Sequence, residues 1–320
     1  MINVLLTGST GFVGSTLLTR ILSLDDLSLS VALRKLTCDL PCRSYLIDGL
    51  TKDTDWSSAL VDQQVVIHAA ARAHIKKDAS CDSLVEYRKV NVEGTENLAM
   101  QAAVAGVKRF IFISSIGVNG INSVHPFTEQ DNECPHDPYS QSKFEAEIRL
   151  KKIALETGMD VVIIRPPLVY GGNAPGNFGS LIKLLAKPLP LPFGAVHNKR
   201  SMVYVGNLVD FIFYCIDQPK AANQIFLISD REDLSLTSLI QKIRKAMNKP
   251  FWLLPIPVVL FNLVGKLTGK MSMVDRLVGD LQVDSSKAMS LLDWKPPYTV
   301  DQGIQATVDS FLENNKKVIK

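Results

Sequence analysis

The stretch VLLTGSTGFVG, residues 4–14, decides the fold of this chain. Three apolar residues suited to a buried strand lead into a turn with glycines at positions 8, 11 and 14, and a helical pattern follows. Glycines let the backbone of such a turn come close to a pyrophosphate, and the next helix offers N–H groups that have no partner within the helix. The stretch therefore predicts a strand, a phosphate-binding turn and a helix.

Short apolar runs and helical patterns alternate through the first half of the chain. Continuous apolar runs, unlike alternating ones, are typical of strands buried on both faces of a parallel sheet. The apolar runs cover residues 4–6, 31–33, 65–67, 110–113 and 161–164, and the helical patterns cover residues 14–24, 92–105 and 139–157. This order predicts an α/β fold with a doubly wound (Rossmann) parallel sheet.

The alternation stops after residue 164. Residues 171–200 are rich in glycine and proline, which indicates loops. We expect short strands at residues 202–205 and 225–228 to return to the sheet. Helical patterns follow at residues 235–247 and, with interruptions, from residue 250 to the end.

These patterns suggest two structural units. Residues 1–165 and 201–229 would form a dinucleotide-binding domain. Residues 166–200 and 230–320 would form a smaller substrate-binding lobe. We expect this lobe to lie over the carboxyl ends of the strands, because ligands bind there in doubly wound sheets.

The composition suits a globular protein and argues against several kinds of partner. The net charge of +3 over 320 residues, without a dense run of Lys and Arg, gives no reason to expect a nucleic-acid partner. The five cysteines form no paired pattern and no histidine has metal-ligand spacing, so we expect free thiols and no metal site. An apolar strand begins directly after Met1, without a signal peptide, which favours a cytoplasmic protein.

The most hydrophobic stretch, residues 251–264, does not predict a membrane span. It is shorter than the roughly 20 residues that a bilayer span requires, and Pro255 and Pro257 interrupt it. We expect a buried helix of the smaller lobe at this place. Peripheral contact with a membrane is the less favoured alternative.

The second apolar run ends in Arg34 and Lys35, where the adenosine ribose of a dinucleotide would lie. An acidic side chain at this place accepts a hydrogen bond from the ribose 2′-hydroxyl, whereas an arginine accommodates a 2′-phosphate. The sequence has no acid here. It therefore favours NADP(H), with NAD(H) as the alternative if both cations are only solvated.

Side chains suited to proton transfer follow the later strands. The run at residues 110–113 ends in Ser114 and Ser115, and Tyr139 and Lys143 are four residues apart in a helical pattern. Residues at this spacing share one face of a helix. A lysine ammonium beside a phenol lowers the phenol pKa toward working pH, so that the phenol can exchange a proton with a hydroxyl while hydride moves to or from a nicotinamide.

Together these motifs resemble those of extended short-chain dehydrogenases/reductases of the nucleotide-sugar epimerase and dehydratase family. The likeness covers nearly the whole chain and implies that Ser115, Tyr139 and Lys143 are catalytic. We expect His68 to be structural, neither acid nor base. We expect Asn91 to be either a capping residue or a residue that supports the side chains of the site without contacting the ligands itself. With the residues above, the resemblance implies dinucleotide contacts from Gly8, Thr10, Gly11, Phe12, Val13, Gly14, Arg34, Asp48, Gly49, His68, Ala69, Ala70, Tyr139, Lys143 and Pro166.

The resemblance also implies how the substrate is held. Arg200 and Arg276 match positions that grip a nucleotide diphosphate, and Asn177 matches a pyrophosphate or sugar contact. Arginine suits this task because its planar fork makes paired, charge-assisted hydrogen bonds to phosphate oxygens. The chain departs from the family dehydratases at Ile116 and Gly117, which replace an Asp-Glu pair, so dehydration is not expected. Asn119 replaces the usual tyrosine of this segment.

The resemblance is greatest to the branch that reduces UDP-4-keto-6-deoxy-N-acetylglucosamine, so a reductase of such a UDP-sugar is the leading hypothesis. A UDP-hexose 4-epimerase with retained NAD is the second. A non-catalytic dinucleotide sensor is the third, although the intact triad argues against it. We also expect a homodimer that pairs the helices at residues 92–105 and 139–157, with Ile148, Ile153 and Leu155 adding apolar surface to the second helix.

Overall fold

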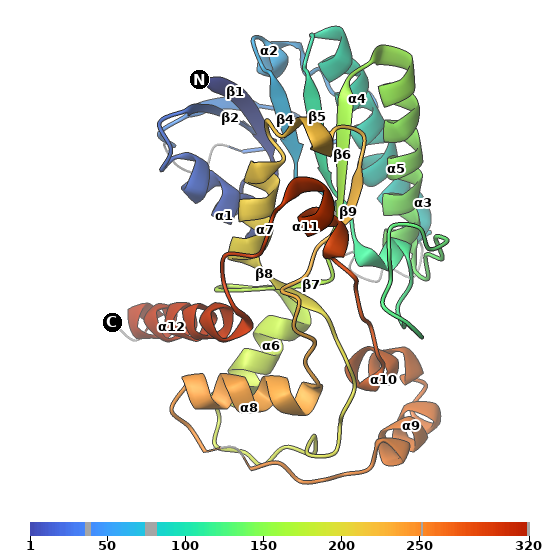
Figure 1. The fold of residues 1–320 in the computed structure, drawn as a ribbon, viewed down its shortest axis with the longest axis vertical. Coiled ribbons are helices and arrows are strands. Elements are labelled where there is room, and N and C mark those ends of the chain that lie inside the picture. The colour runs from blue at the N-terminus through green and yellow to red at the C-terminus, as the bar shows by residue number, and fades with distance from the viewer. Residues whose placement is uncertain (36–39, 74–81, 251, 319–320) are drawn as a thin grey trace.

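The computed structural model describes residues 1–35, 40–73, 82–250 and 252–318. Its main layer is a parallel sheet of seven strands in the order β3-β2-β1-β4-β5-β6-β9 (Figure 1). The strands are β1 (Ile2–Thr7), β2 (Leu27–Leu33), β3 (Arg43–Leu46), β4 (Val65–His68), β5 (Arg109–Ile113), β6 (Asp160–Arg165) and β9 (Ile225–Leu227). The order reverses next to β1, as expected for a doubly wound sheet.

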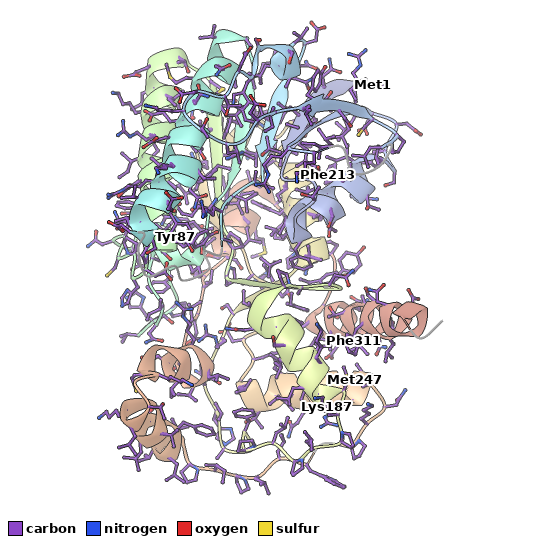
Figure 2. All side chains as sticks on the ribbon, turned by 180° about the vertical axis from the view of Figure 1, so that it is seen from behind. Met1, Tyr87, Lys187, Phe213, Met247 and Phe311 are labelled. Atoms are coloured by element: carbon purple, nitrogen blue, oxygen red, sulfur yellow. The ribbon has the colours of Figure 1, made fainter. Side chains whose placement is uncertain are left out.

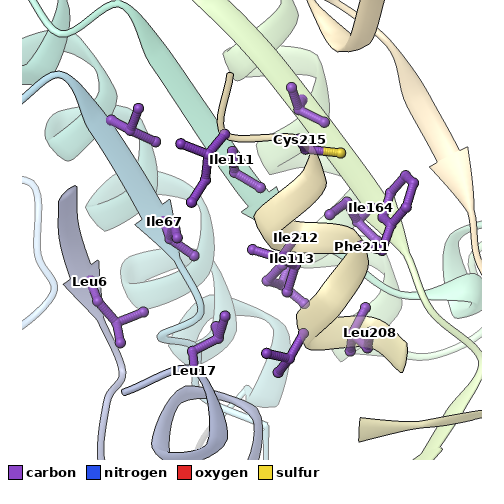
Figure 3. Close-up of a cluster of buried hydrophobic side chains, with 14 of the residues drawn as sticks. Leu6, Leu17, Ile67, Ile111, Ile113, Ile164, Leu208, Phe211, Ile212 and Cys215 are labelled. Carbon is purple, nitrogen blue, oxygen red and sulfur yellow. The ribbon is translucent and has the colours of Figure 1, made fainter. Parts of the chain in front are cut away.

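Helices cover both faces of this sheet because successive strand residues point to opposite faces. Leu6 of β1 packs in one apolar cluster with side chains of α1 and α7, which Figure 3 shows in part. Its neighbour Leu5 packs in a second cluster with side chains of α2, α4 and α5. The helices of the two layers are α1 (Phe12–Ile21), α7 (Val205–Tyr214) and α11 (Ser286–Leu292) on the first face, and α2 (Ser57–Leu60), α3 (Ser83–Arg88), α4 (Gly94–Val104) and α5 (Pro138–Thr157) on the second.

The smaller lobe lies beyond the carboxyl ends of the strands (Figure 1). It has its own apolar cluster, formed by side chains from most of its elements. Its elements are β7 (Leu168–Tyr170), β8 (Met202–Tyr204), α6 (Gly176–Leu185), α8 (Leu236–Ala246), α9 (Val258–Leu267), α10 (Met271–Val278) and α12 (Val300–Val318). Three short helical turns complete the described chain: η1 (Lys89–Glu93), η2 (Ile116–Val118) and η3 (Pro219–Ala221).

The predicted fold class is confirmed, but one predicted strand lies elsewhere. Residues 202–205 do not return to the main sheet, because β8 pairs with β7 in a separate two-stranded sheet. The edge next to β6 is taken by β9, with Ile163 opposite Ile225. The prediction of a strand at residues 225–228 is correct. The assignment of residues 1–165 and 201–229 to one unit, and of residues 166–200 and 230–320 to the other, stays a proposal.

The prediction of a buried helix at residues 251–264 is wrong. Phe251 lies outside the described residues, and α9 begins only at Val258, after Pro257. One face of α9 packs on the lobe, whereas most of its apolar side chains are exposed. No helix in the described part of the chain is long and apolar enough to cross a membrane.

The cysteines and metal-ligand residues form no special cluster in the described ranges. Cys42, Cys134 and Cys215 are free thiols, whereas Cys38 and Cys81 lie outside the described residues. Among the described side chains, no group of three His, Cys, Asp or Glu is placed to hold a metal ion.

Candidate active site

The glycine turn between β1 and α1 is packed so tightly that side chains would not fit. Gly8 has a φ of +77°, and a Cβ atom there would lie 2.6 Å from the backbone nitrogen of Ala70. A Cβ atom on Gly14 would overlap the carbonyl oxygen of Gly8. The Gly11 N–H donates to that same oxygen at 2.9 Å. The glycines therefore bring the start of α1 close to the end of β1.

The same turn suits the phosphates of a dinucleotide. Gly11 is the residue before α1 and has no side chain to cap the first N–H groups of the helix. The Ser9 hydroxyl is buried without a hydrogen-bond partner among the described residues. Thr10 is exposed, and Phe12 and Val13 pack partly on the core. Uncapped N–H groups at a helix start and an unpartnered hydroxyl fit a bound pyrophosphate.

The neighbouring strand ends bring the other predicted dinucleotide contacts to the same edge of the sheet. In the parallel registers, Thr7 lies opposite Ala32 of β2 and opposite His68 of β4. Exposed Arg34 therefore follows β2 beside the turn. Asp48 and Gly49 follow β3, and Ala69 and Ala70 follow β4 at the same edge.

His68 is held in a buried, neutral state. Its Nδ1 atom is 2.7 Å from the Thr7 hydroxyl, and its Nε2 atom is 3.0 Å from the Thr95 hydroxyl. Burial lowers the pKa of His68 to about 3, and the positive charge of Lys143 adds to this effect. A histidine with this pKa does not titrate near neutral pH. These contacts agree with the expectation that His68 is structural.

Helix α5 carries Tyr139 and Lys143 and begins with two strong start signals. The Asp137 carboxylate accepts a hydrogen bond from the Ser140 N–H at 2.8 Å, and Pro138 occupies the first turn, where its missing N–H costs nothing. The Lys143 ammonium donates to the carbonyl oxygen of Ile113 at 2.8 Å. The end of β5 therefore fixes the lysine one helical turn beyond Tyr139.

The electrostatics of the pair differ from the prediction. Burial raises the pKa of Tyr139, and the nearby Asp137 and Tyr87 raise it further. The Lys143 ammonium is 6.0 Å from the centre of the Tyr139 ring. Burial lowers the pKa of Lys143 to about 7, while Glu147 opposes this shift. Tyr139 therefore holds its proton at neutral pH and is suited to act as an acid.

Ser115 lies at the same strand end, half-buried, and caps η2. Its hydroxyl oxygen accepts a hydrogen bond from the Gly117 N–H at 3.1 Å. The next residue, Ile116, donates its N–H to the carbonyl oxygen of Pro166 at 3.0 Å, which brings Pro166 to this place. A Cβ atom on Gly117 would collide with the Ser140 hydroxyl. A side chain at position 117 would therefore require the Ser140 side chain to move.

The two predicted substrate arginines are linked through α10, and one of them reaches the start of α5. Half-buried Arg200 donates to the carbonyl oxygen of Gly279 at 3.0 Å, and Arg276 forms an ion pair with Asp137 at 3.2 Å. Burial lowers the pKa of Arg200, Asp280 opposes this shift, and the positive charge of Arg276 lowers the pKa further. The guanidinium groups are thus close enough to repel each other, which suits a shared anionic ligand.

Asn177 is the predicted substrate residue that the structure does not join to these arginines. It lies exposed in the first turn of α6, near the glycine-rich segment that follows β7. Its role as a pyrophosphate or sugar contact stays a prediction.

Comparison with known proteins agrees with this geometry. Residues 4–229 match the model of the NAD dependent epimerase/dehydratase family. The chain belongs to this family. A relative from Vibrio cholerae, described as UDP-glucose 4-epimerase, is 46% identical over 318 residues, which cover 98% of this chain and 97% of the relative.

A second relative, from Escherichia coli O157:H7, is 32% identical and also similar over nearly its full length. It is described as N-acetyl-alpha-D-glucosaminyl-diphospho-ditrans,octacis-undecaprenol 4-epimerase, and the match covers 98% of this chain and 97% of the relative. The UDP-N-acetylglucosamine 4-epimerase structure from Bacillus cereus has a TM-score of 0.80 at 20% identity, with 98% of this chain and all of that chain covered. The UDP-glucuronic acid 4-epimerase of the same organism, in complex with NAD, has a TM-score of 0.79 at 22% identity over 98% of this chain and 99% of that one.

Membership in the family establishes the broad activity. The protein is an NAD-dependent enzyme of the nucleotide-sugar epimerase/dehydratase type. The hypothesis of a non-catalytic dinucleotide sensor is therefore wrong.

A buried network of hydrogen bonds and one ion pair lies around Glu147, next to Lys143, and was not predicted from the sequence. Glu147 lies one turn after Lys143 and is fully buried with Arg165, at 2.6 Å between Oε2 and Nη2. The Ser114 hydroxyl donates to Glu147 at 2.5 Å, and Arg165 donates to the Asn119 side chain at 3.0 Å. The signal was present: Glu147 follows Tyr139 and Lys143 at steps of four residues, so all three share one helix face.

Asn91 links two segments of the site through hydrogen bonds. Its side chain accepts a hydrogen bond from the Arg72 N–H at 2.8 Å and donates to the Arg72 carbonyl oxygen at 3.0 Å. It also donates to the Ser142 hydroxyl at 3.0 Å, which in turn donates to the Tyr139 carbonyl oxygen. Asn91 therefore ties the segment after β4 to the first turn of α5, which is the supporting role among the two that were expected.

Proposed function

We propose that this protein exchanges a hydride at C4 of a sugar that is linked to UDP. The observation that carries the proposal is the ion pair of Arg276 with Asp137 at the start of α5, together with Arg200, which is bonded to Gly279 just after α10. Asp137, the partner of Arg276, precedes Tyr139 by two residues. Two cations that hold a pyrophosphate there would leave the attached sugar ring beside the phenol.

The residues of the chain would have the following roles in this hydride transfer. A bound nicotinamide dinucleotide supplies or accepts the hydride. Tyr139 gives a proton to the C4 oxygen during reduction, and the Lys143 ammonium stabilises the phenolate that remains. The Ser115 hydroxyl holds the same oxygen. The glycine turn, Asp48 and the strand-end residues His68 to Ala70 would hold the dinucleotide.

The geometry favours net reduction of a 4-keto sugar with NADPH as the first candidate. Exposed Arg34 and Lys35 stand beside the glycine turn, in place of the acid that would accept the ribose 2′-hydroxyl. A UDP-4-keto-6-deoxy-N-acetylhexosamine is the substrate that we expect.

Epimerisation at C4 with retained NAD is the second candidate, and a specific observation favours it. The relatives that are 46% and 32% identical over almost the whole chain are both described as 4-epimerases. An epimerase uses the same tyrosine and lysine in both directions, with no net use of dinucleotide.

One experiment separates the two candidates. The purified protein is analysed for bound NAD, then supplied with NADPH or NADH and UDP-4-keto-6-deoxy-N-acetylglucosamine, and separately with UDP-N-acetylglucosamine or UDP-glucose alone. Consumption of NADPH with the keto sugar supports the reductase. Conversion of the UDP-hexoses into their C4 epimers without added dinucleotide contradicts it and supports the epimerase.

A further inference from the structure

The smaller lobe exposes an apolar surface formed by α9 and the segment that precedes it. Seven of the 22 large exposed apolar side chains in the described part of the chain fall within residues 252–267. We call these seven the α9 surface: Trp252, Leu254, Val259, Leu260, Leu263, Val264 and Leu267. Such clustering in one short segment is the pattern of an interaction site, since scattered exposed apolar residues are common.

The packing of α9 explains why this surface faces outward. The opposite face of the helix carries Phe261, whose ring stacks on Phe193 at 5.7 Å between centres, and Gly265, which packs against Val274 of α10. Leu260, Leu263, Val264 and Leu267 follow the spacing of one helical stripe. Figures 1 and 2 show α9 at the outer end of the lobe, with side chains projecting away from the body. The helix is therefore apolar on two faces, and the lobe covers only one.

The stretch of chain that contains this surface is rich in positive charge. From residue 234 to residue 274 the chain has six Lys or Arg residues and no Asp or Glu. Lys242 is paired with Glu232 and Asp301, and Arg244 is buried. Lys266 and Lys270, which flank the outer end of α9, are exposed and form no ion pair with the described residues.

We propose that the α9 surface docks on a lipid bilayer that carries anionic headgroups. A short helix with an apolar stripe, a tryptophan and flanking lysines suits the interface between headgroups and acyl chains. The ten residues of α9 are too few to span the bilayer, so the helix lies in its surface. A second copy of the chain fits less well, because a two-fold contact through α9 would bring Lys266 and Lys270 of both copies together.

Docking would place the bilayer next to the substrate site. Helix α10 packs against α9 through Val274 and Gly265 and carries Arg276, which pairs with Asp137 at the start of α5. The bilayer contact is thus separated by one helix from an arginine of the proposed substrate site. The proposal itself does not depend on which reaction the site performs.

Sedimentation with vesicles tests the proposal on the full chain. We expect the wild type to bind vesicles that contain phosphatidylglycerol, and to bind pure phosphatidylcholine vesicles more weakly. Val264→Glu should lower the partition coefficient about tenfold or more, because it places a charge in the apolar contact. Val61→Glu is the matched control, since Val61 and Val264 are 58% and 56% exposed on different parts of the molecule. It should bind as the wild type does.

A second pair of variants tests the charge. Lys266→Glu with Lys270→Glu should abolish the preference for phosphatidylglycerol, whereas Lys108→Glu with Lys220→Glu changes the net charge equally at the opposite end of the sheet and should not. Failure of the wild type to bind phosphatidylglycerol vesicles would overturn the proposal. So would a dimer in light scattering that Val264→Glu converts to a monomer, because a second copy would then cover the surface. Unchanged thermal unfolding of each variant excludes misfolding as the cause.

Discussion

Glu147 lies one helical turn after Lys143 on the buried face of α5, and its carboxylate is the negative charge that holds up the pKa of that lysine. The carboxylate is itself fixed by Arg165 and by the Ser114 hydroxyl, next to Ser115. The ion pair therefore joins α5 to β6, and the Ser114 hydrogen bond joins α5 to the end of β5. We regard Glu147 as a positioning residue for the catalytic pair.

Replacement of Glu147 by Gln should affect both stability and catalysis. It leaves the Arg165 charge buried without its main partner, which typically costs about 3–5 kcal/mol of unfolding free energy. It also lowers the Lys143 pKa, so the alkaline limb of the pH–rate profile should move to lower pH. Denaturant unfolding and a pH profile of kcat measure the two effects. A profile that stays in place would show that Glu147 is only structural.

Tyr139→Phe should fold and bind dinucleotide but lose turnover by roughly 10²–10⁴-fold, the usual contribution of a general acid. The phenol ring packs edge-on against Tyr87 at 5.9 Å between centres, and phenylalanine keeps this contact. Single-turnover kinetics and dinucleotide titration provide the measurement. Activity above a tenth of the wild type would rule out Tyr139 as the acid.

Arg34→Asp should shift the cofactor preference from NADPH toward NADH. A charge-assisted hydrogen bond to the 2′-phosphate contributes about 1.5–3 kcal/mol, which is more than tenfold in affinity. Arg43→Asp is the control, because it makes the same charge change at the amino end of β3, away from the glycine turn. The ratio of kcat/KM for the two cofactors is the readout. An equal shift in both variants would contradict a specific role for Arg34.

The pH dependence of stability should reveal the buried lysine. The Lys143 pKa is lowered to about 7 in the folded protein, whereas an unfolded lysine titrates near 10.4. Between these values the unfolded chain binds the additional proton, so this group makes the unfolding free energy rise with pH, by about 2 kcal/mol from pH 7 to pH 9. Urea unfolding of the wild type at both pH values should show this rise. Lys143→Met should lack it, and an identical rise in the variant would contradict the assignment.

The homodimer prediction concerns the outer faces of α4 and α5. Val104 of α4 and Ile148 and Leu155 of α5 are exposed apolar residues there, but Ile153 faces the core, so its predicted share in the surface is wrong. We expect a dimer in light scattering and a monomer for Ile148→Asp. Leu312→Asp, at an exposed position on α12, is the control. A wild-type protein that is monomeric at micromolar concentration would contradict this prediction.

Much of the fold was predictable because buried parallel strands and the glycine turn leave local patterns. The strand β3 was missed because it lies at the edge of the sheet, where its mostly exposed residues show no apolar run. The exposure of α9 was missed because hydrophobicity alone does not tell which neighbours cover a helix. In the site, Tyr139 and Lys143 had a recognisable spacing, whereas Ser115, Arg200 and Arg276 followed from the resemblance to the family. The partners of Glu147, by contrast, come from β6 and the end of β5, and only the folded chain brings them together.

The path of the chain between the sheet and the smaller lobe has a practical consequence. The chain enters the lobe after β6, returns with α7 and β9, leaves again for α8, α9 and α10, and comes back with α11 before ending in α12. The lobe is thus formed by several segments that are separate in the sequence. Exchange of substrate specificity between relatives therefore cannot be achieved by grafting a contiguous cassette, and requires point substitutions or the transplantation of several segments at once.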